Sequence, residues 1–259
     1  MLLAIDIGNT NIDVGLFKQQ ELFANWDLAT DVYKTSDEYA IVLLSLLHHK
    51  GLSKKDIDRS VICSVSPTLI PVFRDVCQRY LGVNPLLVES GVKTGVSILM
   101  DNPREVGPDR IVNAVGGHHL YGGPLIVIDL GTATTFDVVS EKGDYLGGAI
   151  SPGIKVATES LFQRTAKLPR VELVRPKNVI GRDTITAMQS GFIFGYVGLI
   201  EGMVARIQKE LGATTRVIAT GGYAELLAEE TNVIEVVDPY LTLIGLRVIY
   251  ERNLGKKHV

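Results

Sequence analysis

Apolar and polar positions follow two patterns along the chain, and together these predict alternating strands and helices. Short β-branched apolar runs are typical of buried strands and occupy residues 2–7, 61–65, 125–130 and 216–220. Apolar residues spaced every three or four positions are typical of amphipathic helices and occupy residues 36–47, 69–80, 154–164 and 241–253. We expect Ser36 to cap the first of these helices and Gly51 to end the segment. The order of elements predicts an α/β fold.

One strand pattern occurs twice. Residues 3–11 read LAIDIGNTN and residues 126–134 read IVIDLGTAT, so that Asp6 and Asp129 lie 123 positions apart. In each copy an apolar strand ends in Asp, followed by a glycine that permits a tight hairpin beside a ligand. Backbone N–H groups and hydroxyl side chains in such a turn can surround phosphate oxygens. The pattern predicts two phosphate-binding hairpins.

A second repetition follows the first. Residues 61–67 read VICSVSP and residues 217–223 read VIATGGY, an offset of 156 positions, and each is followed by a helical stretch. Both halves therefore have the same order of hairpin, strand, small-residue loop and helix. We expect two similar lobes, residues 1–115 and 116–259, with a cleft between them. Chance similarity of apolar strands is the simpler alternative.

The segment between the two hairpins is predicted to contain an irregular loop followed by a short helix. Residues 101–110 read DNPREVGPDR, in which two prolines and a glycine disfavour regular structure. A helix is expected from Ile111 to His119, so Asp109 lies near its start. A carboxylate at this place can simply cap the helix. Alternatively, Asp109 accepts a proton from a substrate hydroxyl and Arg110 binds an anion.

A long apolar helix is expected from Asp183 to Ile207. It contains Gly191, Gly195, Gly198 and Gly202, and each glycine costs about 1 kcal/mol of helix stability relative to alanine. Close packing must offset this cost. The packing partner is either another part of the same chain or a second subunit.

Composition narrows the function classes. The chain has 259 residues, 46% of them apolar, and a mean hydropathy of +0.21, which is enough for a sizeable core. A net charge of −3 gives no electrostatic reason to expect nucleic acid. The sequence shows neither a signal peptide nor an expected membrane span. Two cysteines, Cys63 and Cys77, form no disulfide framework and are expected to pack in the core. We therefore expect a cytoplasmic protein without a membrane partner.

Four blocks give the chain a specific resemblance. They are DIGNTN at residues 6–11, NPREVGPDR at residues 102–110, DLGTATTFD at residues 129–137 and TGGYA at residues 220–224, and DPYLTLIGL at residues 238–246 supports them. With these blocks the chain resembles the type III pantothenate kinases of the actin-like superfamily. The resemblance implies two ribonuclease H-like lobes, each a mixed sheet with flanking helices, with ATP in the cleft. It also implies phosphorylation of the primary hydroxyl of pantothenate, which is the first step of coenzyme A biosynthesis.

The resemblance also implies roles for individual residues. Asp109 is the expected catalytic base, and Asp6 is expected to act on Mg²⁺ through water. The expected ATP-binding residues are Asp6, Ile7, Gly8, Asn9, Thr10, Asn11, Ile12, Asp13 and Thr132. The expected pantothenate-binding residues are Met100, Gly107, Pro108, Asp109, Arg110 and Thr184. Asp129 is expected to bind a monovalent cation, K⁺ or NH₄⁺, and the helix that follows Asp183 is expected to form a homodimer.

Two positions depart from the family pattern. Met100 stands where the family often has an aromatic residue, and it can pack against substrate but not offer a polar contact. Pro108 stands where alanine is common. Two other functions remain open: another small-molecule kinase of the superfamily, which need not keep the GPDR block, and a nucleotide-gated transcriptional accessory protein, which would bind ATP without turnover.

Overall fold

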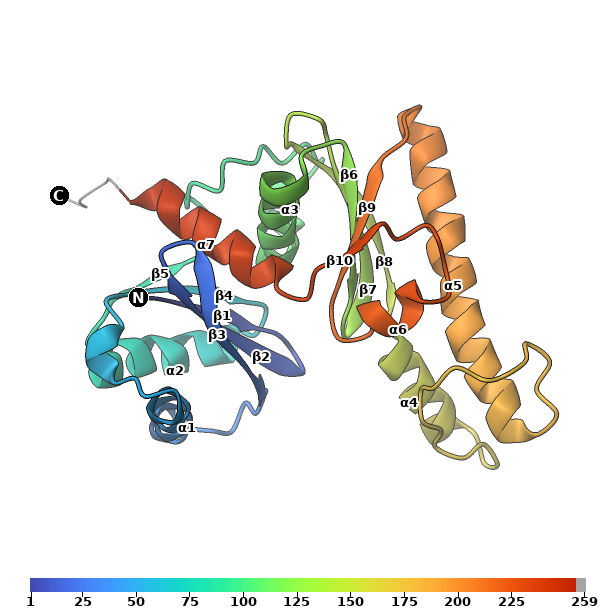
Figure 1. Cartoon of the computed structure of the whole chain (residues 1–259), viewed down its shortest axis with the longest axis horizontal. Helices are drawn as coiled ribbons and strands as arrows, with labels where there is room; N and C mark the ends of the chain where they lie inside the picture. Colours follow the sequence, from blue (N-terminus) through green and yellow to red (C-terminus); the bar gives the residue numbers. More distant parts are fainter. Residues whose placement is uncertain (255–259) are drawn as a thin grey trace. The chain divides into compact units, whose positions relative to one another are not determined.

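A computed structural model describes residues 1–254, which form two compact units (Figure 1). The first unit contains residues 1–96 and 101–119 together with the segment that starts at residue 241. The second unit contains residues 97–100 and 120–240. Each unit has its own sheet and its own hydrophobic core.

The first unit is built on a five-stranded sheet. Its strands are β1 (Leu2–Ile7), β2 (Asn11–Lys18), β3 (Glu21–Ala29), β4 (Arg59–Ser64) and β5 (Pro85–Leu87). Its helices are α1 (Ser36–His49), α2 (Ile70–Asp75), which continues as a π-helical segment (Val76–Leu81), α3 (Pro108–Tyr121) and α7 (Leu241–Asn253). Short 3₁₀ turns occupy Lys54–Asp56, Pro67–Leu69 and Pro103–Glu105. Helices α1 and α2 cover one face of the sheet, and α7 packs against β1, β2 and β4 (Figure 1).

The second unit repeats this plan. Its strands are β6 (Leu125–Leu130), β7 (Ala133–Val139), β8 (Tyr145–Pro152), β9 (Arg216–Thr220) and β10 (Val236–Val237). Its helices are α4 (Ile154–Arg164), α5 (Thr184–Leu211) and α6 (Ala224–Ala228). Apolar residues of all three helices join those of β6, β7 and β9 in one core.

The two sheets have the same topology. In the first the strand order is β3-β2-β1-β4-β5, and in the second it is β8-β7-β6-β9-β10. The inner strands β1 and β6 each pair antiparallel with the next strand and parallel with the one that returns, β4 or β9. This matched topology confirms the prediction of two similar mixed-sheet lobes, because chance similarity of apolar runs would not produce equal strand orders.

The sheet register corrects the second repetition by one residue. Ala4 pairs with Val61, whereas Val127, its equivalent in the other unit, pairs with Ile218. Equivalent positions of β4 and β9 are therefore 157 residues apart in the structure, whereas the similarity of the two sequence segments predicts 156. Because successive side chains of a strand point to opposite faces, this single residue decides which side chains lie beside the two aspartates.

The units differ from the division at residues 115 and 116 that the sequence predicts. Helix α7 belongs to the first unit, since Gly245 packs on the backbone of α3 at Val112. Residues 97–100 belong to the second unit, because Leu99 donates a backbone hydrogen bond to Tyr145 over 2.8 Å. Both differences arise from contacts between segments that are distant in the sequence.

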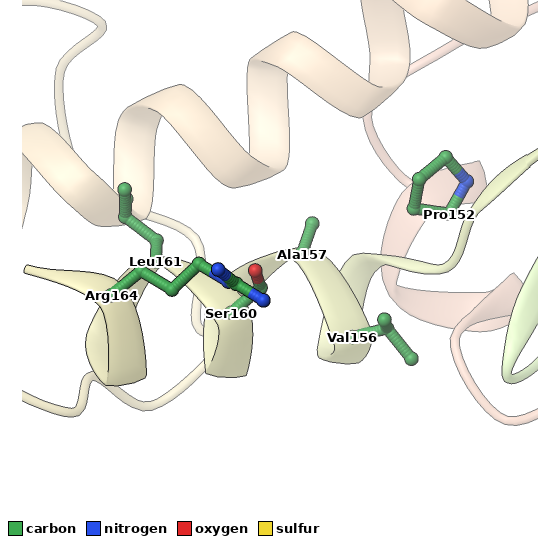
Figure 2. A pocket seen from close by; sticks show the side chains of 6 residues that line it. All are labelled: Pro152, Val156, Ala157, Ser160, Leu161 and Arg164. Carbon is green, nitrogen blue, oxygen red and sulfur yellow. The ribbon is translucent and has the colours of Figure 1, made fainter.

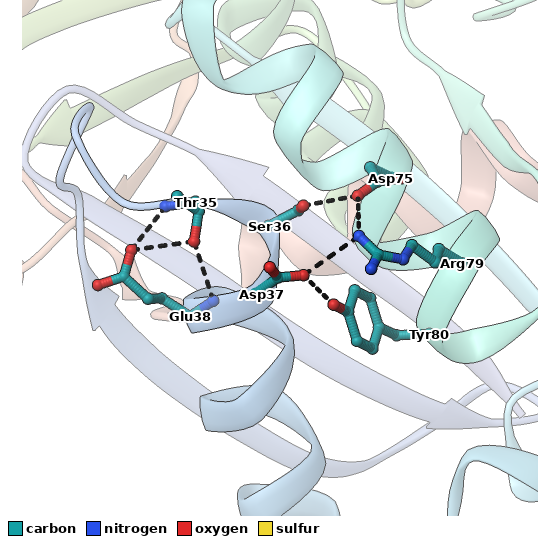
Figure 3. Close-up of polar contacts among 7 residues, drawn as sticks. All are labelled: Thr35, Ser36, Asp37, Glu38, Asp75, Arg79 and Tyr80. Carbon is teal, nitrogen blue, oxygen red and sulfur yellow. Dashed lines mark hydrogen bonds and ion pairs between the residues drawn. The ribbon is translucent and has the colours of Figure 1, made fainter.

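The start of α1 also differs from the prediction. Thr35, not Ser36, is the N-cap: its hydroxyl accepts from the Glu38 N–H at 3.4 Å, and the Glu38 carboxylate accepts from the Thr35 N–H at 2.8 Å (Figure 3). Ser36 instead donates to Asp75 over 2.6 Å. Asp37 pairs with Arg79 and accepts a hydrogen bond from Tyr80 (Figure 3). These contacts join α1 to α2 and its π-helical continuation.

Candidate active-site residues in the two units

The turn between β1 and β2 is held by backbone contacts. The Gly8 N–H donates to the Asn11 carbonyl over 2.9 Å, and a Cβ at Gly8 would lie only 2.8 Å from that oxygen. Thr30 fixes the turn from β3, with its hydroxyl on the Gly8 carbonyl at 2.8 Å and its N–H on the Thr10 carbonyl at 2.9 Å. Asn9, Thr10 and Asn11 are exposed. The turn therefore presents three polar side chains on a fixed backbone.

Two of the predicted ATP-binding residues lie in the core. Ile7 and Ile12 pair across the hairpin, and both side chains are fully buried. They belong to the hydrophobic cluster beneath α1 and α2. Their side chains therefore hold the hairpin, and only their backbone groups are suited to a nucleotide.

Carboxyl groups and a thiol form a row across the first sheet. Asp13 is paired with Asp6 on one side and with Asp27 on the other, and Asp6 is paired in turn with Cys63 on β4. Directly paired residues project from the same face of a sheet. Burial, together with the hydrogen bond and charge of Asp27, raises the pKa of Asp13 to about 7. Asp27 and Cys63 were not among the predicted site residues, because their place in the row follows from strand pairing alone.

Asp109 lies in the first turn of α3. The helix begins at Pro108, earlier than the predicted Ile111, so Asp109 is a helical residue and not the residue that precedes the helix. Burial raises the pKa of Asp109, while the backbone N–H and the charge of Arg110 oppose the rise. A Cβ at Gly107 would lie 2.4 Å from the Asp109 carboxylate oxygen. Glycine at position 107 therefore leaves the space that this carboxylate occupies.

Cys63 links the sheet to α3. Burial raises the pKa of the Cys63 thiol well above its usual range, and the charges of Asp6 and Asp109 add to the rise. Both carboxylates therefore lie near the same thiol. The structure brings the predicted base and the predicted phosphate-side aspartate together within the first unit.

Helix α7 fixes the position of α3. A Cβ at Gly116 would lie 2.6 Å from the Leu241 carbonyl oxygen, and a Cβ at Gly245 would lie 2.1 Å from that of Val112. Thr242 also donates to the Asn113 amide oxygen over 2.7 Å. The two helices thus approach through glycines, and this close approach sets where Asp109 lies.

In the second unit, Asp129 lies among glycines. Its carboxylate oxygen would be 2.7 Å from a Cβ at Gly221, which has a φ of +92°, and 3.2 Å from a Cβ at Gly131. Thr132 lies in the turn, and its carbonyl accepts from the Gly153 N–H at 3.1 Å. A carboxylate bordered by bare backbone suits a hard cation, which favours carboxylate and carbonyl oxygens. The oxygen donors present therefore fit the monovalent cation that the family resemblance implies.

A buried network supports this part of the second sheet. Asp137 has no exposed surface and accepts hydrogen bonds from Thr135 at 3.0 Å and from Tyr145 at 2.7 Å. Thr135 is the strand partner of Asp129. The sequence did not single out Asp137 or Tyr145 for a role, because their contact joins two strands.

Thr184 and Met100, two predicted substrate contacts, also lie in the second unit. Thr184 is exposed at the first position of α5 and lines a pocket of about 510 Å³. Its other lining residues are Leu161, Leu168, Ala187, Met188, Gly191 and Phe192. Met100 lies beside β8, with its Cγ 3.9 Å from where a Cβ at Gly147 would be. Gly107, Pro108 and Arg110 belong to the first unit.

A second pocket, of about 350 Å³, lies along α4 (Figure 2). It is lined by Pro152, Val156, Ala157, Ser160, Leu161 and Arg164. Its lining is mainly apolar, and Arg164 supplies a cation at one end (Figure 2). The predicted base, Asp109, does not line this pocket or the one at Thr184.

Two further features bear on ligands and membranes. Within residues 1–254, no group of three or more His, Cys, Asp or Glu side chains is placed to hold a metal ion.

Helix α5 is long and apolar enough to cross a membrane by length and composition, with a mean hydropathy of 1.3 over 18 residues and 28% of that window buried. Core helices of soluble proteins meet the same criterion, so it is weak support for a membrane span.

Comparison with known proteins gives consistent matches. A family model described as type III pantothenate kinase matches residues 2–206. A type III pantothenate kinase from Moorella thermoacetica is 55% identical over 253 residues, which cover 98% of this chain and 100% of the relative.

Among solved structures, a candidate Baf family transcriptional activator from Campylobacter jejuni aligns with a TM-score of 0.62 at 20% identity, covering 97% of this chain and 98% of the other. The activator of 2-hydroxyisocaproyl-CoA dehydratase from Clostridium difficile, with bound ADPNP, aligns with a TM-score of 0.53 at 14% identity, covering 100% and 98%. At these identities the two structures support the fold alone.

Proposed function

The chain belongs to the type III pantothenate kinase family, and we infer from this membership that it transfers the γ-phosphate of ATP to the primary hydroxyl of pantothenate. The products are ADP and 4′-phosphopantothenate, and the reaction is the first step of coenzyme A biosynthesis. The observation that carries the mechanism is the place of Asp109, which is half-buried at the start of α3 and acts electrostatically on the thiol that pairs with Asp6.

Asp109 is the proposed general base. Its carboxylate takes the proton from the pantothenate hydroxyl as the oxygen attacks the γ-phosphorus, and it later returns this proton to solvent. Burial helps this role, because a raised pKa makes the carboxylate a better proton acceptor. Arg110 is proposed to bind the pantothenate carboxylate, and Gly107 and Pro108 shape the same segment. Thr184 and Met100 are proposed as further pantothenate contacts.

The β1–β2 turn is proposed to bind the phosphates of Mg·ATP. Its support is the fixed backbone from Gly8 to Asn11 and the exposed polar side chains along it. Asp6 acts on the Mg²⁺ of this substrate through bound water, since Mg²⁺ retains several waters in such sites. Thr132 contributes from the second hairpin. Catalysis then consists mainly of positioning and charge neutralisation.

Asp129 is proposed to hold the monovalent cation, K⁺ or NH₄⁺. Its support is the position of this carboxylate against the bare backbone of Gly131 and Gly221. When bound, this ion supplies positive charge toward phosphate oxygens. We further propose that the protein is a cytoplasmic homodimer formed through α5.

The test is phosphorylation of pantothenate by the purified chain with Mg·ATP, in K⁺ and in Na⁺, with the product identified by mass. We expect 4′-phosphopantothenate, formed faster in K⁺. Asp109→Asn should lower kcat by roughly 10²- to 10⁴-fold, because the proton acceptor is lost. ATP binding and thermal stability should remain.

The matched control is Asp101→Asn, which alters an exposed carboxylate in the same segment and should leave kcat unchanged. A near wild-type rate in Asp109→Asn would remove this residue from the role of base. Absence of any product with intact ATP binding would favour another hydroxyl substrate or a regulatory protein.

A further inference from the structure

The two free cysteines occupy different environments. Cys77 belongs to the hydrophobic cluster under α1 and α2, together with Leu43 and Phe73. Cys63 has no exposed surface either, but it projects from the opposite face of β4, beside Asp6. The expected role in core packing describes Cys77 and leaves the position of Cys63 unexplained.

The neighbours of Cys63 indicate which group its thiol proton is donated to. Cys63 lies directly opposite Asp6 on the neighbouring strand, and hydrogen bonding between its thiol and the Asp6 carboxylate contributes to the raised pKa of the thiol, whereas the Ser64 backbone N–H opposes the rise. A thiol has one proton to donate and a carboxylate only accepts, so the S–H group is the donor to Asp6. An apolar side chain of similar size would fill the same space without this bond.

The second unit has the same arrangement at the equivalent position. Asp129 corresponds to Asp6, and its strand partner on β9 is Thr220, which is 2% exposed. A threonine hydroxyl is also a small donor. Both halves of the molecule therefore place a buried S–H or O–H group on the strand that pairs with the aspartate. Packing alone does not require a donor at either position.

We propose that Cys63 is a positioning residue, whose thiol holds the Asp6 carboxylate in the orientation that binds the water shell of Mg²⁺ in Mg·ATP. This inference rests on the proposed function of Asp6. Outer partners of this kind commonly change metal affinity or activity by 10- to 100-fold when they are removed. The proposal assigns the thiol no contact with substrate and no covalent step.

The deciding variants are Cys63→Thr and Cys63→Val. Threonine and valine have nearly the same shape, so both strain the site equally, and only threonine retains a donor. We expect Cys63→Thr to bind Mg·ATP and to turn over within about threefold of the wild type. Cys63→Val should raise the Mg²⁺ concentration for half-maximal activity and the KM for Mg·ATP by roughly 10- to 100-fold.

Cys77 supplies the matched control. Cys77 lies in the cluster on the opposite face of the sheet from Asp6, with Ser60 as the hydrogen-bond partner of its thiol, so Cys77→Val and Cys77→Thr should have the same Mg²⁺ dependence whatever their thermal stability. Equal Mg²⁺ dependence in Cys63→Thr and Cys63→Val would overturn the proposal. If neither variant folds, Cys63→Ser and Cys63→Ala provide the same comparison with smaller side chains.

A calorimetric titration separates this proposal from the proposed reaction. Mg²⁺-dependent binding of a non-hydrolysable ATP analogue needs no pantothenate, so it reports on Asp6 whatever the acceptor is. Weaker binding to Cys63→Val than to Cys63→Thr would support the positioning role even if pantothenate were not phosphorylated. Equal binding would reject this role even if the kinase reaction were established.

Discussion

At the scale of single residues, the pKa of a carboxyl group depends on which residues the folded chain places beside it. Partial burial and the neighbouring Asp27 carboxyl raise the pKa of Asp13 to about 7. Asp109 is also half-buried and its pKa is raised, but the N–H and the charge of Arg110 oppose this rise. The two carboxyl groups of the first unit therefore share desolvation as the cause of a raised pKa but differ in their neighbours, a second carboxyl at Asp13 and a cation at Asp109.

The pH dependence of unfolding should reveal Asp13. Its pKa is about 7 in the folded state against an ordinary value of 3.8, so the stability that this proton contributes is complete below pH 4 and is lost as pH rises to 7. Asp13→Asn cannot ionise. Its free energy of unfolding, relative to the wild type, should therefore increase by roughly 2–4 kcal/mol between pH 4 and pH 8.

Urea unfolding at both pH values measures this difference. Asp101→Asn is the control, because Asp101 is exposed and its replacement should give the same difference at each pH. Parallel stability curves for Asp13→Asn and the wild type would show that Asp13 is ionised in the folded protein at neutral pH.

At the scale of elements, the position of α3, the helix that carries the proposed base, depends on α7. Helix α3 carries Asp109, and α7 approaches its backbone at Gly116 and through Gly245. The amphipathic pattern of residues 241–253 predicts a helix but not its partner. Helix α7 packs on α3 because glycines at the contact allow the two backbones to approach closely.

Gly245→Ala should disrupt this pair of helices. The added Cβ would lie 2.1 Å from the Val112 carbonyl oxygen, and a backbone atom cannot step aside as a side chain does. We expect a loss of roughly 1–3 kcal/mol in the free energy of unfolding, and a fall in kcat as α3 shifts. Denaturant unfolding and kcat measure the two effects.

Gly222→Ala is the comparison for stability, since, apart from its two chain neighbours, no heavy atom of the described chain lies within 4 Å of the Cβ it would add. Its free energy of unfolding should change by less than about 0.5 kcal/mol. Wild-type stability in Gly245→Ala would mean that α3 and α7 separate readily.

At the scale of the whole molecule, α5 raises the question of a second subunit. Its apolar side chains at Ile193, Val197 and Ile200 are buried in the second unit. Gly191, Gly195 and Gly198 are exposed, and within residues 1–254, apart from their chain neighbours and the backbone of α5 itself, no heavy atom lies within 4 Å of a Cβ added at any of them. Packing inside the described chain therefore does not offset the cost of these glycines, and a second copy of the helix would.

Light scattering should detect a dimer with twice the 28.2 kDa mass of the chain. Gly195→Leu places a large side chain on the glycine face and should weaken the dimer at least tenfold, because close approach of the two helices is blocked. Lys209→Leu, at an exposed position near the end of the same helix, is the control. A wild-type monomer at working concentration would contradict the proposal.

The sequence alone determined much of this protein. The strand at residues 2–7 and the helices at 154–164 and 241–253 have the bounds that their apolar patterns predict. The repeated Asp-apolar-Gly hairpins predicted two lobes of the same topology, and motifs in chain order indicated the family. These features are local: a strand, a turn or a helix is encoded by a few neighbouring residues, so it can be predicted from the sequence.

Only the tertiary structure decided which segments meet. The structure shows that the equivalent positions of β4 and β9 are one residue further apart than predicted. It also shows that Thr35 is the N-cap of α1 and that α7 belongs to the first unit. It also paired Cys63 with Asp6 and Asp27 with Asp13. Strand register and backbone approach between helices depend on residues far apart in the chain. The surroundings of each carboxylate, and hence its proton affinity, exist only once these segments are packed together.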